Sequence, residues 1–300
     1  NVVSDIDLTL LPAPDAVEAF DFETIFARRK ARLIELCPAG IRKAVAATLE
    51  LESEPLTIDL QQQAYQEILL RQRINEAARA GMLAFAEGAD LDHIGALRGL
   101  ARKTIRPANP RAVPPVEAVY ESDTDFRRRI QLHPEKYAAA GPAAAYVAHA
   151  LDAHADVADA QAVRVRAGTV RVYVKSYSGG GVPAQAVLNA VSNKLSGENV
   201  RPLCDTVEVQ AARKKEVRIE YEAEYLTGPD KDLIKQAQRR ALDDLAAKSG
   251  KIGGFVALSK IIGALDMEGV YRIRLISPTA DVACQDGEFI VITAVTAREA

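Results

Sequence analysis

The chain has 300 residues, of which 48% are apolar, so it is long enough for about two domains and can bury a sizeable core. Its formal net charge is -3, and acidic and basic residues are well mixed along the sequence, which excludes an evident binding surface for nucleic acid. Its three scattered cysteines exclude a disulfide framework and a thiolate metal cage, and we expect them to be reduced, as in the cytosol.

The first residues, NVVSDIDLTLLPAPD, lack the basic leader of a signal peptide. Asp5, Asp7 and Pro12 interrupt their apolar residues, and no other stretch reaches membrane-spanning length. We therefore expect neither a signal peptide nor direct membrane insertion.

The region from residue 22 to about residue 100 follows the helical period of apolar residues. The predicted helices span 22–36, 41–51, about 55–85 and about 88–99. The third would measure roughly 45 Å at 1.5 Å per residue, and it carries two apolar stripes. We expect such a rod to pack in a helical bundle with other chains. The apolar residues assigned to that interface are Phe22, Phe26, Leu33, Leu60, Tyr65, Ile68, Leu69, Met82 and Phe85.

Four prolines between residues 102 and 119 predict an extended connector and a domain boundary. Ser122 is then expected to cap a helix that has Asp123 and Asp125 in its first turn. Pro142 is expected to open a further helix as its first residue.

After residue 156 the pattern changes to period two. A hairpin is predicted at 163–175, a helix from Pro183 to Leu195, and a strand in DTVEVQAA. EVRIEYEAEY is the clearest strand, with apolar and charged residues alternating. Asp230 should cap a helix to about Lys248, GGFVALSKIIGAL should form another, and VYRIRLI and EFIVITAV should be strands.

The predicted fold class is therefore α+β, with an elongated N-terminal helical region followed by two successive antiparallel-sheet α+β units. The expected domains are a bundle-forming region at 1–101, a connector with helices at 102–156, a first α+β unit at 157–214 and a second at 215–300.

A glycine turn raises the possibility of a cofactor site, since Gly179, Gly181 and Ala184 match the loose dinucleotide pattern G-x-G-x-x-G/A. The preceding strand alternates, however, whereas a Rossmann first strand is continuously apolar. Pro183 also removes an amide that the helix start would offer to a phosphate. We interpret Gly179, Gly181 and Pro183 as residues that define a tight turn.

The remaining polar residues carry no recognisable catalytic signature. His149 and His154 are five apart, so they do not share a helix face as a metal pair would. The chain has no Trp and no nucleophile motif, and we assign no catalytic, cofactor-binding or metal-binding residue. The basic runs at 27–32 and 125–131 are interpreted as solvated helix faces or, alternatively, as polar interfaces with another subunit.

Five segments resemble, in order and spacing, the baseplate J-like proteins of contractile phage tails and of R-type pyocins, which have relatives in type VI secretion. They are GADLDHIGALRGLARK, ESDTDFRRRIQ, GPAAAYVAHALDA, VYVKSYSGGGVP and NVRPLCDTVEVQAA. The resemblance runs from about residue 20 to the end and is most specific from Gly88 to Ala212.

This resemblance implies a structural protein without a cofactor, made in the bacterial cytoplasm and built into the baseplate of a contractile injection particle. Two copies in different conformations would join a smaller baseplate I-like partner in a wedge, through a bundle of N-terminal helices. Residues 215–300 would join wedges into a six-fold ring around the hub, next to a sheath-proximal wedge protein, and the ring would transmit the trigger for sheath contraction. The residues carried over as fold-defining are Gly141, Pro142, Tyr146, Arg201, Pro202 and Asp205. Cys204 departs from the hydroxyl residue expected there.

Two alternative functions remain open from the sequence. One is a nucleotide-binding enzyme that uses the turn at 179–184. The other is an adaptor protein of a different assembly. Stabilisation by NAD, FAD or ATP would favour the enzyme, because a ligand that binds only the native state must stabilise it.

Overall fold

The computed structural model describes residues 8–14, 16, 21–137, 141–197, 200–202, 204–228 and 230–299. The chain divides into two compact units, Ser4–Ala101 and Arg102–Ala300. Asp5 and Asp7, which argue from the sequence against an apolar leader, lie outside the described residues.

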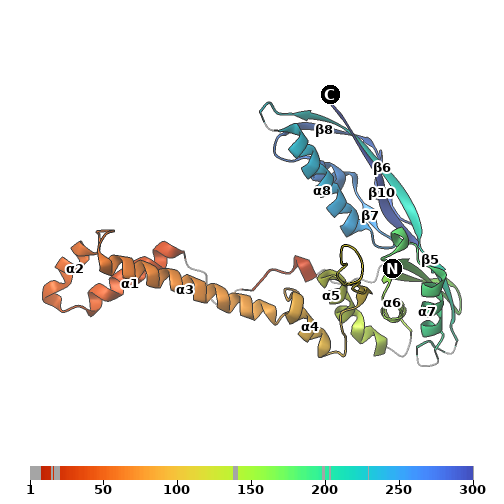
Figure 1. Ribbon diagram of the computed structural model, residues 1–300, viewed down its shortest axis with the longest axis horizontal. Coiled ribbons are helices and arrows are strands. Elements are labelled where there is room, and N and C mark those ends of the chain that lie inside the picture. Colours follow the sequence, from red (N-terminus) through yellow and green to blue (C-terminus); the bar gives the residue numbers. More distant parts are fainter. Residues whose placement is uncertain are drawn as a thin grey trace. The chain divides into compact units, whose positions relative to one another are not determined.

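The first unit is helical (Figure 1). Its elements are η1 (Leu8–Leu10), α1 (Phe22–Leu36), η2 (Ala39–Ile41), α2 (Arg42–Thr48), α3 (Pro55–Ala80) and α4 (Gly88–Ala96). The side chain of Asp21 caps α1 by accepting from the Thr24 amide at 2.7 Å, and Pro55 stands at the start of α3, where its missing N–H is harmless. Helices α1 and α3 pack against each other, and Ile25, Leu49 and Leu60 form part of a small core.

The structure contains the predicted long helix, but the helix is shorter than expected. Helix α3 has 26 residues and ends at Ala80, with Gly81 as its C-cap, so the sequence prediction of a helix to Phe85 was wrong. Glycine is a poor helix residue, and a tight turn follows in which the Phe85 and Ala86 amides donate to the Met82 carbonyl. Met82 and Phe85 therefore lie beyond the helix. Helix α2 is also shorter than predicted, because it forms only over Arg42–Thr48.

The second unit begins with a hairpin rather than the extended connector that its prolines predict. Strands β1 (Thr104–Arg106) and β2 (Val119–Tyr120) pair antiparallel, and a bridge joins Asn109 to Val116 between them. The prolines lie in the loop of this hairpin, where a missing N–H removes no ladder bond.

Three helical segments follow, α5 (Asp123–Leu132), η3 (His133–Tyr137) and α6 (Ala143–Leu151). The predicted cap of α5 is confirmed, since the Ser122 hydroxyl accepts from the Asp125 amide at 3.1 Å. Pro142 is the N-cap of α6 and stands just outside the helix, not at its first position.

The first sheet has the order β3-β4-β5, with β3 (Val157–Arg166), β4 (Thr169–Ser176) and β5 (Thr206–Ala211). Strands β3 and β4 form the predicted antiparallel hairpin, but β4 and β5 are parallel. The prediction of an antiparallel sheet was therefore wrong in part. Turn η4 (Gly179–Gly181) and helix α7 (Gln185–Leu195) carry the chain back between β4 and β5, as a parallel crossover requires. Ala184 caps α7, so Pro183 precedes the helix.

The second sheet has the order β10-β6-β8, with β6 (Arg213–Tyr225), β8 (Val270–Ser277) and β10 (Glu288–Glu299). It is also mixed, because β6 pairs antiparallel with β8 but parallel with β10. Helices α8 (Lys231–Ser249) and α9 (Leu258–Leu265) and the short pair β7 (Phe255–Val256) and β9 (Val282–Ala283) complete it. Of the predicted helix GGFVALSKIIGAL, only Leu258–Leu265 is helical, because Phe255–Val256 form strand β7.

The alternation predicted for β6 is confirmed. Val217, Ile219, Tyr221 and Ala223 are buried in a core that α8 and α9 help to form. Figure 1 shows α8 on one face of this sheet only. The other face carries a row of glutamates, which pair with arginines of the neighbouring strands at 3.4 to 3.7 Å. The α+β class predicted from the sequence is confirmed.

The two sheets of the second unit are joined by close packing around the end of β4. Tyr173, Ala212 and Phe289 form a small apolar cluster there, and the Ala212 amide donates to the Val174 carbonyl at 2.8 Å. The Asp159 carboxylate adds a polar link, because it accepts from the Ile252 amide at 2.8 Å.

Candidate interaction surfaces

Helix α3 exposes more apolar surface than a helix of a compact domain needs to. Leu69 is 47% exposed and Leu70 is 65% exposed. Ile58, Tyr65 and Leu69 are seven and four residues apart, so they share one flank of the helix, and Leu70 and Ile74 share another. Contiguous exposed apolar surface of this kind marks sites where proteins associate.

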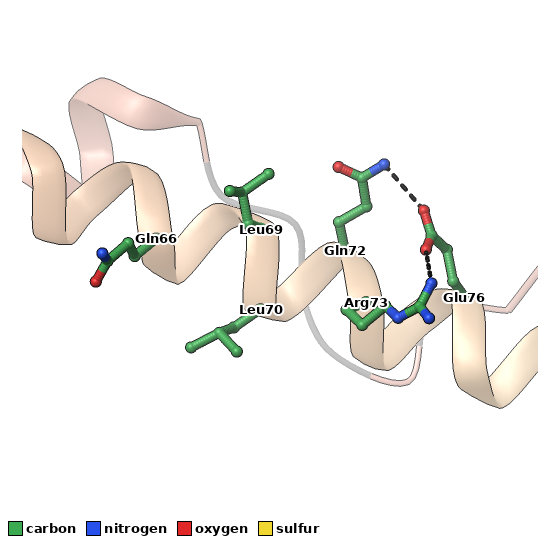
Figure 2. A pocket seen from close by; sticks show the side chains of 6 residues that line it. All are labelled: Gln66, Leu69, Leu70, Gln72, Arg73 and Glu76. Atoms are coloured by element: carbon green, nitrogen blue, oxygen red, sulfur yellow. Dashed lines mark hydrogen bonds and ion pairs between the residues drawn. The ribbon is translucent and has the colours of Figure 1, made fainter.

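A hollow of about 580 Å³ lies over this part of α3 and is open to solvent. Its lining residues are Gln66, Leu69, Leu70, Gln72, Arg73 and Glu76. Figure 2 shows Leu69 and Leu70 pointing to different sides of the helix, while Gln72 and Arg73 both bond to Glu76, at 3.1 and 3.3 Å. Because all six residues belong to one helix, the hollow lacks the converging walls of a small-molecule site and suits a macromolecular contact.

The residues that the sequence assigns to a bundle interface differ in exposure. Leu60 is only 6% exposed and packs inside the chain's own core. Tyr65, Leu69 and Met82 are exposed. The half-buried members of the set are Phe22, Phe26, Leu33, Ile68 and Phe85. The sequence interpretation missed Leu70 and Ile74, although their spacing of four on the same helix was a readable signal.

A cluster of charged groups holds α1 against α3. Glu67 of α3 accepts from Arg29 of α1 at 2.8 Å and from Arg71 of its own helix at 3.0 Å, and it also pairs with Arg28. Burial alone would raise the pKa of Glu67, but the hydrogen bonds from Arg28, Arg71 and Arg29 outweigh it and lower the pKa to about 2. The carboxylate is therefore ionised throughout the physiological range.

The two basic runs act within the chain. In the first run, Lys30 pairs with Glu50 at 2.8 Å, and Arg32 pairs with Glu35 at 2.7 Å. In the second, Arg128 pairs with Asp159 at 2.6 Å. The Arg32–Glu35 pair remains exposed, as expected of a solvated face, whereas Arg128 and Asp159 are mostly buried.

A buried ion cluster lies between α5 and α6. Arg129 pairs with Glu121, which is 2% exposed, and donates to Asp152 at 3.1 Å, and Lys136 also pairs with Asp152. Burial lowers the pKa of Lys136 to about 8. Glu121 immediately precedes the Ser122 cap of α5. The structure shows it as one partner of a buried ion pair, because its contact is eight residues away on the next helix.

The residues carried over as fold-defining meet at one place in the second unit. The Tyr146 hydroxyl donates to Asp205 at 2.7 Å, and Arg201 donates to the Asp205 carbonyl at 2.7 Å. Burial and the Asp205 contact raise the pKa of Tyr146 above its usual range. Gly141 has a positive φ of 61°, and a β carbon there would lie 2.6 Å from the Pro202 side chain. The close approach explains why glycine stands at 141.

The glycine turn is packed against the second sheet. Gly179, Gly180 and Gly181 all have positive φ, and Gly181 is buried. A β carbon at Gly181 would lie 2.6 Å from the Phe289 ring, which therefore fills the inner side of the turn. Lys175 lies over the other part of that ring, 4.8 Å from its centre. At Gly181 the geometry is therefore that of a tightly packed turn.

His149 and His154 lie in different surroundings. His149 is half-buried on α6, where burial lowers its pKa, whereas His154 lies beyond the helix and accepts from the Asp156 amide at 3.1 Å. Among the described residues, no group of three or more His, Cys, Asp or Glu side chains is placed to hold a metal ion. No helix in the described ranges is both long and apolar enough to cross a membrane.

Comparison with known proteins gives three matches to domain families along the chain. Residues 52–109 match the baseplate J-like N-terminal domain, 138–211 the central domain and 217–298 the C-terminal domain. The chain is 45% identical to baseplate protein J of Escherichia phage P2 over 277 residues, which cover 92% of both proteins.

Among solved structures, a chain of the anti-feeding prophage baseplate, determined by cryo-EM with 6-fold symmetry imposed, aligns at a TM-score of 0.39 and 13% identity. The alignment covers 61% of this chain and 43% of that chain, and the likeness is too low to establish a shared fold.

Proposed function

The chain belongs to the baseplate J-like family, and on that premise we propose that it is a non-enzymatic wedge subunit of the baseplate of a contractile injection particle. In this proposal it assembles with a second copy of itself, in another conformation, and with a smaller baseplate I-like protein. Wedges form a six-fold ring around the hub and next to a sheath-proximal wedge protein, and the ring transmits the trigger for sheath contraction.

The exposed apolar surface of α3 is the observation that carries this proposal. Five large apolar side chains stand exposed in the stretch from Ile58 to Ile74, on two flanks of a 26-residue helix. A helix with two apolar flanks has room for a neighbour on each side, as in a bundle. We assign these flanks to the N-terminal helices of the second copy and of the baseplate I-like partner.

The second unit has a different role in the proposal. Its last part, residues 215–300, joins neighbouring wedges, and the ion cluster around Arg129 fixes the helices that precede the sheets. The absence of a catalytic role is part of the proposal too. It is supported by the packed glycine turn, whose inner side is filled by the Phe289 ring.

Coexpression with the baseplate I-like protein tests the bundle. We expect a stable complex of two copies of this chain with one partner. Full burial of a leucine contributes about 1.5–3 kcal/mol, so burying the exposed fractions of Leu69 (47%) and Leu70 (65%) contributes about 2–3 kcal/mol together. Replacing both by Ser should therefore weaken the complex by about 30- to 150-fold, since about 1.4 kcal/mol corresponds to a factor of ten.

Two further variants control this experiment. Gln62→Ser changes an exposed polar residue of the same helix and should leave the affinity unchanged. Leu60→Ala removes a core side chain and should lower thermal stability instead. Failure of the wild-type chain to copurify with the partner would contradict the wedge, and full affinity in the Leu69→Ser, Leu70→Ser chain would contradict the assignment of α3.

A further inference from the structure

Strand β10 has one unpaired side. It forms an edge of the β10-β6-β8 sheet, beside β6 (Figure 1). Its first residues are covered on the outer side, because Ile252 bridges to Phe289 and the Gly253 amide donates to the Glu288 carbonyl at 2.8 Å. From Val291 onward, no other strand in the described part of the chain pairs with this side.

The sequence along this edge is unusual for an unpaired strand. Residues 291–297 read VITAVTA, with no charge, no proline and no glycine, and five of the seven are β-branched Val, Ile or Thr; the charged Arg298 and Glu299 follow only at the end of the strand. Natural proteins normally protect a free edge with charged residues or proline. The opposite edge follows that rule, because β8 carries Arg272 and Arg274. The edge of β10 thus has the composition of a strand that is paired.

The side chains of this stretch are divided between the two faces of the sheet. Ala294 and Thr296 are exposed and lie in register with Arg218 and Glu220 on the charged face. Val295 lies in register with the buried Ile219 on the face that the helices cover. An added strand would therefore extend both faces only if its own side chains alternate in the same way.

We propose that the outer edge of β10 pairs antiparallel with β10 of a second copy, around a two-fold axis near Thr296. Strand edges satisfy each other's main-chain groups in this arrangement, and a copy of the same strand has the required alternation. The charges along the two edge strands favour β10 over β8 as the strand that pairs with a second copy. Two-fold pairing of β8 would bring Arg272 and Arg274 close to their own equivalents. Pairing of β10 around Thr296 instead places Val295 opposite Ala297 and Arg298 opposite Ala294, so no like charges face each other across the axis. The two three-stranded sheets would become one continuous sheet with both sets of helices on the same face.

This inference rests on the proposed function, since it specifies the edge by which residues 215–300 join two copies. The test uses the full-length chain and measures its self-association by sedimentation velocity over a range of concentrations. Thr296→Lys and Thr296→Glu each place like charges across the axis, and each should weaken the dimer by about tenfold or more. An equimolar mixture of the two variants places Lys opposite Glu and should restore dimerisation to about the wild-type level. Thr206→Lys, on the exposed edge strand β5 of the other sheet, is the matched control and should dimerise like the wild type.

The outcomes separate this inference from the wedge itself. All three Thr296 samples should still copurify with the baseplate I-like partner, because that contact is assigned to α3. A wild-type chain that stays monomeric, or a Thr296→Lys chain that dimerises as tightly as the wild type, overturns the pairing of β10. The same holds if the mixture of Lys and Glu variants fails to recover. Loss of partner binding in the wild type contradicts the proposed function instead.

Discussion

Replacing Gly181 by Ala tests how the glycine turn is held. Gly181 has a φ of 95°, and an added β carbon would lie 2.6 Å from Cζ and 2.8 Å from Cε2 of Phe289. Gly179 has a φ of 61°, with nothing within 4 Å of its β-carbon position. The two substitutions thus impose the same change in chemistry, but only the one at Gly181 meets a buried ring.

The magnitudes follow from these two geometries. An alanine in the left-handed region costs about 1–2 kcal/mol, which is the whole effect expected at Gly179. Carbon atoms are in optimal contact at about 3.5–4.0 Å, so the Phe289 ring would have to move by about 1 Å to admit the new methyl group. Overpacking of that kind costs about 1–3 kcal/mol more. We therefore expect Gly181→Ala to lower the local free energy of unfolding by about 2–5 kcal/mol.

Hydrogen exchange is the appropriate assay, because the chain has two units and a single unfolding transition would mix them. The Ala212 amide, bonded to Val174, reports on the cluster that contains Phe289. A double-mutant cycle with Phe289→Leu isolates the steric part, and the coupling energy should be about 1–3 kcal/mol. Equal losses for Gly179→Ala and Gly181→Ala, with coupling below about 0.5 kcal/mol, would refute the packing argument.

Three further predictions concern polar groups. The pKa of Glu67 is about 2 in the folded state, against 4.5 for a free glutamate, so the ionised side chain stabilises the fold above about pH 4.5 and this stabilisation is lost as the pH falls toward 2. Solvent screening limits the contribution to about 1–2 kcal/mol. Glu67→Gln should therefore flatten the acid part of a curve of melting temperature against pH. Gln238 is fully buried and accepts from Tyr221 at 3.0 Å, so Gln238→Leu should lower the free energy of opening, measured by hydrogen exchange, by about 2–4 kcal/mol. A smaller loss in a Tyr221→Phe background would confirm the cause. Tyr146→Phe removes the 2.7 Å bond to Asp205 and should cost about 1–3 kcal/mol by the same measurement, whereas an unchanged value would show that the bond is not stabilising.

Local patterns in the sequence were sufficient for most individual elements. The cap at Ser122 and the alternation of β6 depend on residues within a few positions of each other, and both are confirmed. The end of α3 at Gly81 was also readable, because glycine stops helices, but the continuing apolar residues Met82 and Phe85 obscured it.

Contacts between distant residues could not be read in the same way. The parallel pairing of β10 with β6 joins residues that are about 75 positions apart, and only the path of the chain between them decides its direction. The ion pairs of Arg29 and Arg128 likewise join residues 38 and 31 positions apart, so the basic runs looked solvated. For the candidate surface, the sequence indicated α3, but which apolar residues face the chain's own core depends on how α1 packs against it.

The small core of the helical unit has a consequence for the supply of this chain in a cell. Few of its large apolar residues are fully buried, Ile25, Leu49 and Leu91 among them, while α3 exposes six large apolar residues to water. Segments with little buried apolar area open most readily, and open segments are the ones that proteases cut. In copies that are made in excess of their partners, proteases would cut this helical unit first. Degradation of the excess, and not the rate of synthesis, would then set the ratio of subunits.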